Sequence, residues 1–147
     1  MIWFNISIVL LAGAMLPLQA GVNAQLARNS GHALWASGAS FLVGSLVLIA
    51  LYAGLKQPWP GVTQLKEAPL WAWSGGLMGA FFVSSMVIFA PKLGATTLLA
   101  LVIAGQMTAA LVIDHYGMIG FNNHQISLLR LMGVLLIAAG VVLVRKF

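Results

Sequence analysis

The chain has 147 residues, of which 61% are hydrophobic and only 6% charged, and its mean hydropathy is +1.02. A soluble domain carries about 25% charged residues, so this composition excludes an ordinary soluble domain and predicts an integral membrane protein. The net charge of +5 comes from residues beside apolar stretches, which is typical of headgroup anchors and argues against a nucleic-acid partner.

Five apolar stretches have the length of about 20 residues that a bilayer requires. The expected helices cover residues 3–27, 33–55, 69–90, 95–113 and 127–144. Pro17 interrupts the first helix, residues 59–68 form a polar loop, and Pro91-Lys92-Leu93-Gly94 forms a tight connection between the third and fourth helices. The sequence therefore predicts one all-α transmembrane domain, residues 1–147, with five helices and no internal repeat.

The basic residues are split almost evenly between the two sides of the membrane. Five spans place Lys56, Lys66 and Arg130 on the side of the N-terminus, side A, and Arg28, Lys92, Arg145 and Lys146 on the other, side B. The positive-inside rule predicts the orientation of a chain from the distribution of its Lys and Arg residues. A distribution of three against four gives only a weak preference for one orientation. Two hypotheses follow: the chain inserts in both orientations, or it inserts one way with side B in the cytoplasm.

No Asp, Glu, Lys or Arg lies in the middle of a predicted span, and the deep polar residues are amides. Gln19 and Asn23 are four residues apart and share a face of the first helix, while Gln106 lies near the centre of the fourth. An amide in hydrocarbon costs several kcal/mol without a partner. We therefore expect these three side chains to line a solute-binding cavity, or else to form hydrogen bonds that only hold helices together.

Other polar residues are weaker candidates for a cavity or a gate. They are Asn5, Ser40, Ser84, Thr97 and the pair Asp114-His115. Ser and Thr can bond to their own helix backbone, and an acid–His pair either couples to protons or ends a helix at the interface. A negative charge at a helix C-terminus is unfavourable, so Asp114 is expected to have a partner, Arg130 or His124.

Small residues that allow close helix contacts in lipid recur at helical spacing. Gly75 and Gly79 form a GxxxG pair, which fits contacts within one subunit as well as contacts between subunits. Gly133 and Gly140 share one face of the last helix, where a contact between subunits is favoured.

An enzyme is not expected. With two acidic residues, three His and no Cys, the chain shows no nucleophile–base set, predicts no cofactor and offers no spacing typical of a metal site.

Several motifs occur in the order and spacing of a known family. They are the run from Pro17 to Arg28, Gly75-Gly76-Leu77-Met78-Gly79-Ala80, Lys92-Leu93-Gly94-Ala95, Ala104-Gly105-Gln106 and Asp114-His115-Tyr116-Gly117. Across essentially the whole chain this pattern resembles the YdcZ family of five-helix inner-membrane proteins in the drug/metabolite transporter superfamily. The resemblance implies a small-solute exporter in the bacterial inner (plasma) membrane. Larger members of the superfamily contain two inverted five-helix halves, so a chain with one half is expected to pair with a second, inverted half.

The leading hypothesis combines these observations. Two copies of the chain, or one copy and a paralogue, form a ten-helix antiparallel bundle that transports small organic solutes by alternating access, with neutral or zwitterionic solutes favoured by the absence of a deep acid. Inverted repeats around a midplane site are a known transporter architecture. The alternative is a non-transporting accessory or assembly subunit of the membrane.

Overall fold

The computed structural model describes residues 2–146, and every regular element in that range is helical. In chain order the elements are α1 (Ile2–Ser30), α2 (Ala33–Gly54), α3 (Val62–Glu67), η1 (Leu70–Ser74), α4 (Gly75–Leu93), α5 (Ala95–Tyr116), η2 (Met118–Gly120) and α6 (Leu128–Lys146). Met1 and Phe147, the ends of the predicted domain, lie outside the described residues. Five segments are long and apolar enough to cross a membrane: Ile2–Ser30, Ala33–Gly54, Leu70–Leu93, Ala95–Tyr116 and Leu128–Lys146. The all-α class with five candidate spans is thereby confirmed.

The structure corrects the sequence prediction at two connections. The predicted loop at 59–68 contains the short helix α3, whose first turn is capped because the Gln64 side chain accepts a hydrogen bond from the Gly61 N–H at 2.9 Å. Pro91 does not end its helix, because α4 continues to Leu93. Proline fixes φ near the helical value, and the chain turns instead at Gly94, whose φ of 76° suits glycine.

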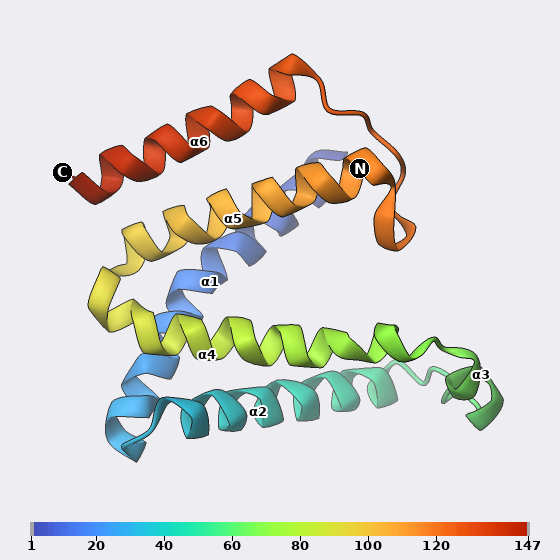
Figure 1. Cartoon of the computed structure of the whole chain (residues 1–147). Helices are drawn as coiled ribbons and strands as arrows, with labels where there is room; N and C mark the ends of the chain where they lie inside the picture. The colour runs from blue at the N-terminus through green and yellow to red at the C-terminus, as the bar shows by residue number, and fades with distance from the viewer. Residues whose placement is uncertain (1, 147) are drawn as a thin grey trace. The chain divides into compact units, whose positions relative to one another are not determined.

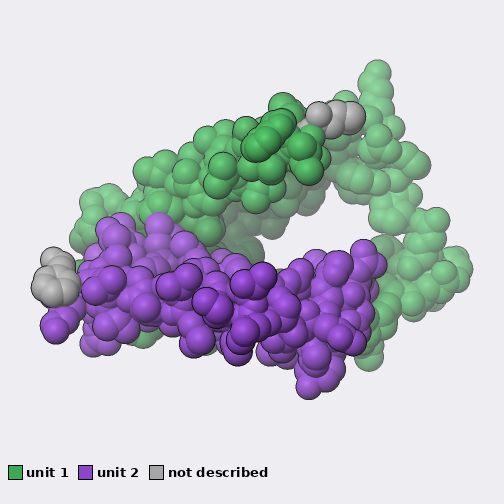
Figure 2. Space-filling view, turned by 90° about the horizontal axis from the view of Figure 1, so that it is seen from above, with its two compact units in different colours: residues 1–91 green, residues 92–147 purple. Residues whose placement is uncertain are grey.

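The described chain falls into two compact units, which Figure 2 shows in different colours. Unit 1 comprises residues 1–91 and unit 2 residues 92–147.

In unit 1, α1 and α2 form a helical hairpin, and α4 runs antiparallel to α2 (Figure 1). The hairpin turns at Gly31, where φ is 80°, and the His32 imidazole caps α2 by accepting from the Leu34 N–H at 3.3 Å. The buried apolar side chains of this unit are small or flexible: Ala20, Ala24, Ala36, Met86 and Val87. Small residues let membrane helices approach closely, so this packing brings the polar face of α1 towards its neighbours.

The GxxxG pair of α4 has unequal surroundings. A Cβ on Gly79 would lie 3.0 Å from Cζ of Phe41 in α2, whereas a Cβ on Gly75 would meet nothing within 4 Å. Gly79 therefore sits at a helix–helix contact inside unit 1. Gly75, Gly133 and Gly140 have open space beside them.

We expect Gly79→Val to destabilise the protein by about 1–3 kcal/mol, because the added branches overpack the contact with Phe41. Gly75→Val is the matched control and is expected to cost less than about 1 kcal/mol. Unfolding of both variants in mild detergent, followed by circular dichroism, measures the difference. Equal losses would show that Gly79 makes no special contact.

Unit 2 is built around a second hairpin, in which α6 packs against α5 (Figure 1). Gly117 ends α5 in the left-handed conformation, with φ 59° and ψ 38°. The fourth span was predicted to end at residue 113, but α5 continues to Tyr116. Asp114 and His115 are therefore part of the last helical turn.

Candidate solute site

Asn23 carries a buried amide on α1. Asn23 is only 5% exposed, and its Nδ2 is the one buried side-chain nitrogen or oxygen in residues 2–146 that has no hydrogen-bond partner. It lines a cavity of about 10 Å³ between α1 and α4, together with Leu16, Gln19, Ala20, Phe82, Val83, Met86 and Val87. Two of the predicted site residues, Gln19 and Asn23, thus share one small cavity.

A larger hollow lies beside this cavity and shares Gln19 with it. This hollow, the α1–α2–α4 groove, has a volume of about 250 Å³ and is lined by Gln19, Ser40, Phe41, Gly44, Ser45, Leu48 and Val83. The structure therefore brings Gln19 and Ser40 together, as two of the predicted candidates. Phe41 and Ser45 were not predicted as site residues.

Gln19 lies deep within the candidate membrane span of α1. It is eleven residues before Ser30, the end of α1, or about 16 Å along the helix axis. The hydrocarbon core is about 30 Å thick, so this distance is about half a membrane. Asn23 lies one turn nearer the end of the helix.

Gln106 lies near the middle of α5 in unit 2. It is eleven residues after Ala95 and ten before Tyr116, the two ends of α5, which is again about 15–16 Å from each end. Its side chain is exposed, and no group within unit 2 gives it a hydrogen bond. Thr108, two residues on, instead donates to the Ala104 carbonyl at 2.8 Å.

The remaining candidates do not line these hollows. Asn5 is exposed on the first half of α1, and Ser84 and Thr97 are half-buried on α4 and α5.

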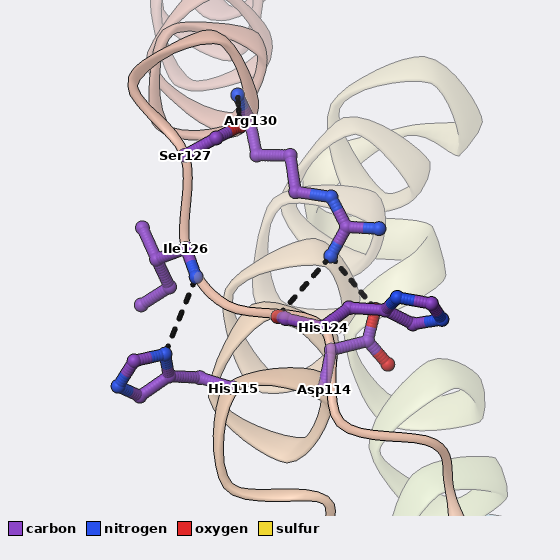
Figure 3. Close-up of polar contacts among 6 residues, drawn as sticks. All are labelled: Asp114, His115, His124, Ile126, Ser127 and Arg130. Carbon is purple, nitrogen blue, oxygen red and sulfur yellow. Dashed lines mark hydrogen bonds and ion pairs between the residues drawn. The ribbon is translucent and has the colours of Figure 1, made fainter.

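Asp114 is held by groups from the α5–α6 connection, as Figure 3 shows. The Arg130 guanidinium lies 3.3 Å from the Asp114 carboxylate and also donates to the His124 carbonyl at 3.5 Å. The backbone N–H of His124 donates to the Asp114 carbonyl at 2.7 Å. The expectation that Asp114 has a compensating partner is confirmed, and the side-chain partner is Arg130.

His115 helps to hold the same connection. Its Nδ1 accepts a hydrogen bond from the Ile126 N–H at 3.2 Å (Figure 3). Asp114 and His115 therefore both tie the α5–α6 loop to the end of α5. These contacts favour a structural role for the pair over a proton-coupling role.

We expect Arg130→Gln to cost about 1 kcal/mol of stability or less. The side chains of Arg130 and Asp114 are 43% and 32% exposed, and exposed ion pairs contribute about 0–1 kcal/mol. Thermal unfolding in detergent checks the value, with Lys66→Gln as a control that removes a basic residue from the same side. A loss of several kcal/mol would show that the loop depends on this pair far more than its exposure indicates.

Residues 2–146 contain no group of three or more His, Cys, Asp or Glu side chains that could hold a metal ion.

The five candidate spans in the described residues define an all-α, multi-pass membrane protein. The family model described as "Putative inner membrane exporter, YdcZ" matches residues 4–143. The chain belongs to this YdcZ family.

A curated protein is similar to this chain over most of its length. The chain is similar to "Inner membrane protein YdcZ" of Escherichia coli (strain K12), with 28% identity over 131 residues that cover 88% of this chain and 83% of the relative. No solved structure matches the chain. The protein is therefore a multi-pass protein of the bacterial inner membrane. Its family supports transport at the general level and points away from an enzyme.

Proposed function

We propose that two copies of this chain, inserted in opposite orientations, form a ten-helix transporter that moves small uncharged or zwitterionic solutes by alternating access. The observation that carries the proposal is the pair of midplane amides, Gln19 and Gln106, one in each unit. Both side chains are exposed, and neither makes a hydrogen bond within its own unit.

Exposed amides at this depth are incompatible with lipid contact. Transfer of an unpaired amide into hydrocarbon costs about 4–8 kcal/mol, and polar groups within spans face a bundle interior or a water-filled cavity. A second five-helix copy supplies such an interior. The odd number of spans, together with the three-to-four distribution of basic residues, favours a second copy that is inverted.

The chemistry of the amides also indicates the solute. Residues of the α1–α2–α4 groove carry no formal charge, so a fully charged solute would lose its hydration without gaining an ion pair. Amides offer both donors and acceptors, which suit hydroxyl, amide and zwitterionic groups. In the inverted dimer each copy exchanges its conformation with the other copy when the cavity opens to the opposite side.

Transport can be tested in proteoliposomes with radiolabelled amides, amino acids, betaines and polyols of low mass. We expect saturable uptake of at least one solute, accelerated when the same unlabelled solute is loaded inside, because alternating access permits exchange. A folded protein that gives no saturable uptake of any of these classes would contradict the proposal and favour the accessory subunit.

A further inference from the structure

We propose that the α1–α2–α4 groove binds the uncharged hydrogen-bonding end of the solute, and that Asn23 positions Gln19 for this contact through one buried water. The inference rests on the proposed function, because it identifies the solute subsite of the same transporter. It assigns Gln19 as a contact residue and Asn23 as a positioning residue.

The groove combines polar groups with an aromatic wall and carries no charge. Gln19 of α1 lines it together with Ser40, Ser45 and Phe41 of α2. A ligand pocket of about 300–1,000 Å³ suits a drug-sized ligand, so a groove of about 250 Å³ suits a smaller one. A small solute with an amide or hydroxyl end fits both the size and the chemistry.

The two hydroxyls of the groove are free to bind. Ser and Thr in membrane helices commonly bond to the carbonyl four residues earlier, as Ser37 does with the Ala33 carbonyl at 3.0 Å. Ser40 and Ser45 make no such bond. The same helix therefore provides a satisfied hydroxyl outside the groove and two unsatisfied hydroxyls inside it.

Asn23 cannot contact a solute in the groove directly, because it lies in the adjoining cavity of about 10 Å³. A cavity of about 10–15 Å³ holds about one water when polar partners are present. The unpaired Nδ2 of Asn23 can donate to that water, and the Gln19 amide lines the same cavity. One water between the two amides would orient Gln19, whose side chain also reaches the groove.

Benzamide, benzoate and benzamidinium form a matched set of probes, because they have nearly the same shape and carry charges of zero, minus one and plus one. We would measure equilibrium binding of each radiolabelled probe to the full chain in lipid nanodiscs. Benzamide is expected to bind, with both charged probes about tenfold weaker or more, since the groove gives neither charge a partner. Equal binding of all three probes, or no binding of benzamide, would overturn the groove assignment.

Variants of the groove separate contact from positioning. Gln19→Leu and Ser40→Ala are each expected to weaken benzamide binding by about tenfold. Ser37→Ala is the matched control on α2, and it should bind as the wild type does because its hydroxyl is already used by its own helix. Wild-type binding by both Gln19→Leu and Ser40→Ala would contradict the groove assignment.

Asn23 is tested with two substitutions. Asn23→Leu keeps the branched shape, at a somewhat larger volume, and removes the donor, so it should weaken benzamide binding about tenfold while leaving the charged probes as weak as before. Asn23→Ser leaves a hydroxyl and room for a further water, so it should restore part of the affinity. If both variants lose binding to the same extent, or both bind normally, Asn23 does not position Gln19.

Binding and transport distinguish this inference from the proposed function. Solute transport that depends on Gln106 but proceeds without benzamide binding would overturn the groove assignment alone. Benzamide binding with the expected variant pattern, in a protein that transports no solute, would leave the groove in place and overturn the transporter.

Discussion

Two variants that are each fixed in a single orientation should lose transport when expressed alone and regain it when expressed together. The near-balance of basic residues is what allows both orientations under the positive-inside rule. Gln57→Lys, Gln125→Lys and Arg145→Gln together raise side A from three basic residues to five and lower side B from four to three. Side A should then remain in the cytoplasm.

The opposite variant carries Ser30→Lys and Lys66→Gln, which give side A two basic residues and side B five. The substituted positions are exposed, so the fold should tolerate them. Uptake by cells is measured for each variant and for the pair, and a neutral set at the three positions that gain lysine (Gln57→Asn, Gln125→Asn, Ser30→Thr) serves as the control. Full activity of one variant alone would show that a parallel assembly or a monomer suffices.

Gln106→Leu should abolish transport without preventing assembly. The amide lies near the middle of α5 with no partner in its own unit, so the proposed cavity requires it and the stability of α5 does not. Leucine is more favourable in lipid than an unpaired amide, and assembly should be unchanged or stronger. Uptake in proteoliposomes and chemical cross-linking of the dimer measure the two properties separately.

Thr108→Val is the matched control for Gln106→Leu. It removes a polar group from the same helix two residues away, but the Thr108 hydroxyl is already satisfied by Ala104. Transport should remain at about the wild-type level. If Gln106→Leu transports normally, or if it loses the dimer together with transport, Gln106 is not a cavity residue.

Composition and hydropathy were enough to predict the spans, because a bilayer imposes one length and one polarity on every crossing helix. Local conformation at their ends was harder to predict. Pro91 indicated a break, yet a proline near a helix C-terminus loses only one backbone hydrogen bond, and Gly94 sets the turn.

The polar face of α1 could also be predicted, because Gln19 and Asn23 are four residues apart. In the structure the two residues share a cavity. The difference in role that we propose for them could not be predicted. It depends on α4, whose side chains enclose Asn23 but leave Gln19 open to the groove, and the sequence does not state which helix packs against that face.

Ser45 and Phe41 were missed for a related reason. Phe41, Gly44, Ser45 and Leu48 follow the i, i+3, i+4, i+7 spacing of one helix face, so their common position was detectable. Of the polar residues in this helix, only Ser40 was predicted as a cavity candidate. A serine that shares a face with a deep amide of a neighbouring helix is better interpreted as a site candidate.

Cysteine labelling tests the inverted dimer most directly, because the native chain contains no cysteine. Thr63→Cys places a single exposed thiol on α3, on side A, and Ser30→Cys places one on side B. In intact cells a membrane-impermeant maleimide should label about half of each variant, as an inverted dimer with equal populations of the two orientations requires. Complete labelling of one variant and none of the other would contradict the dual orientation on which the proposed transporter depends.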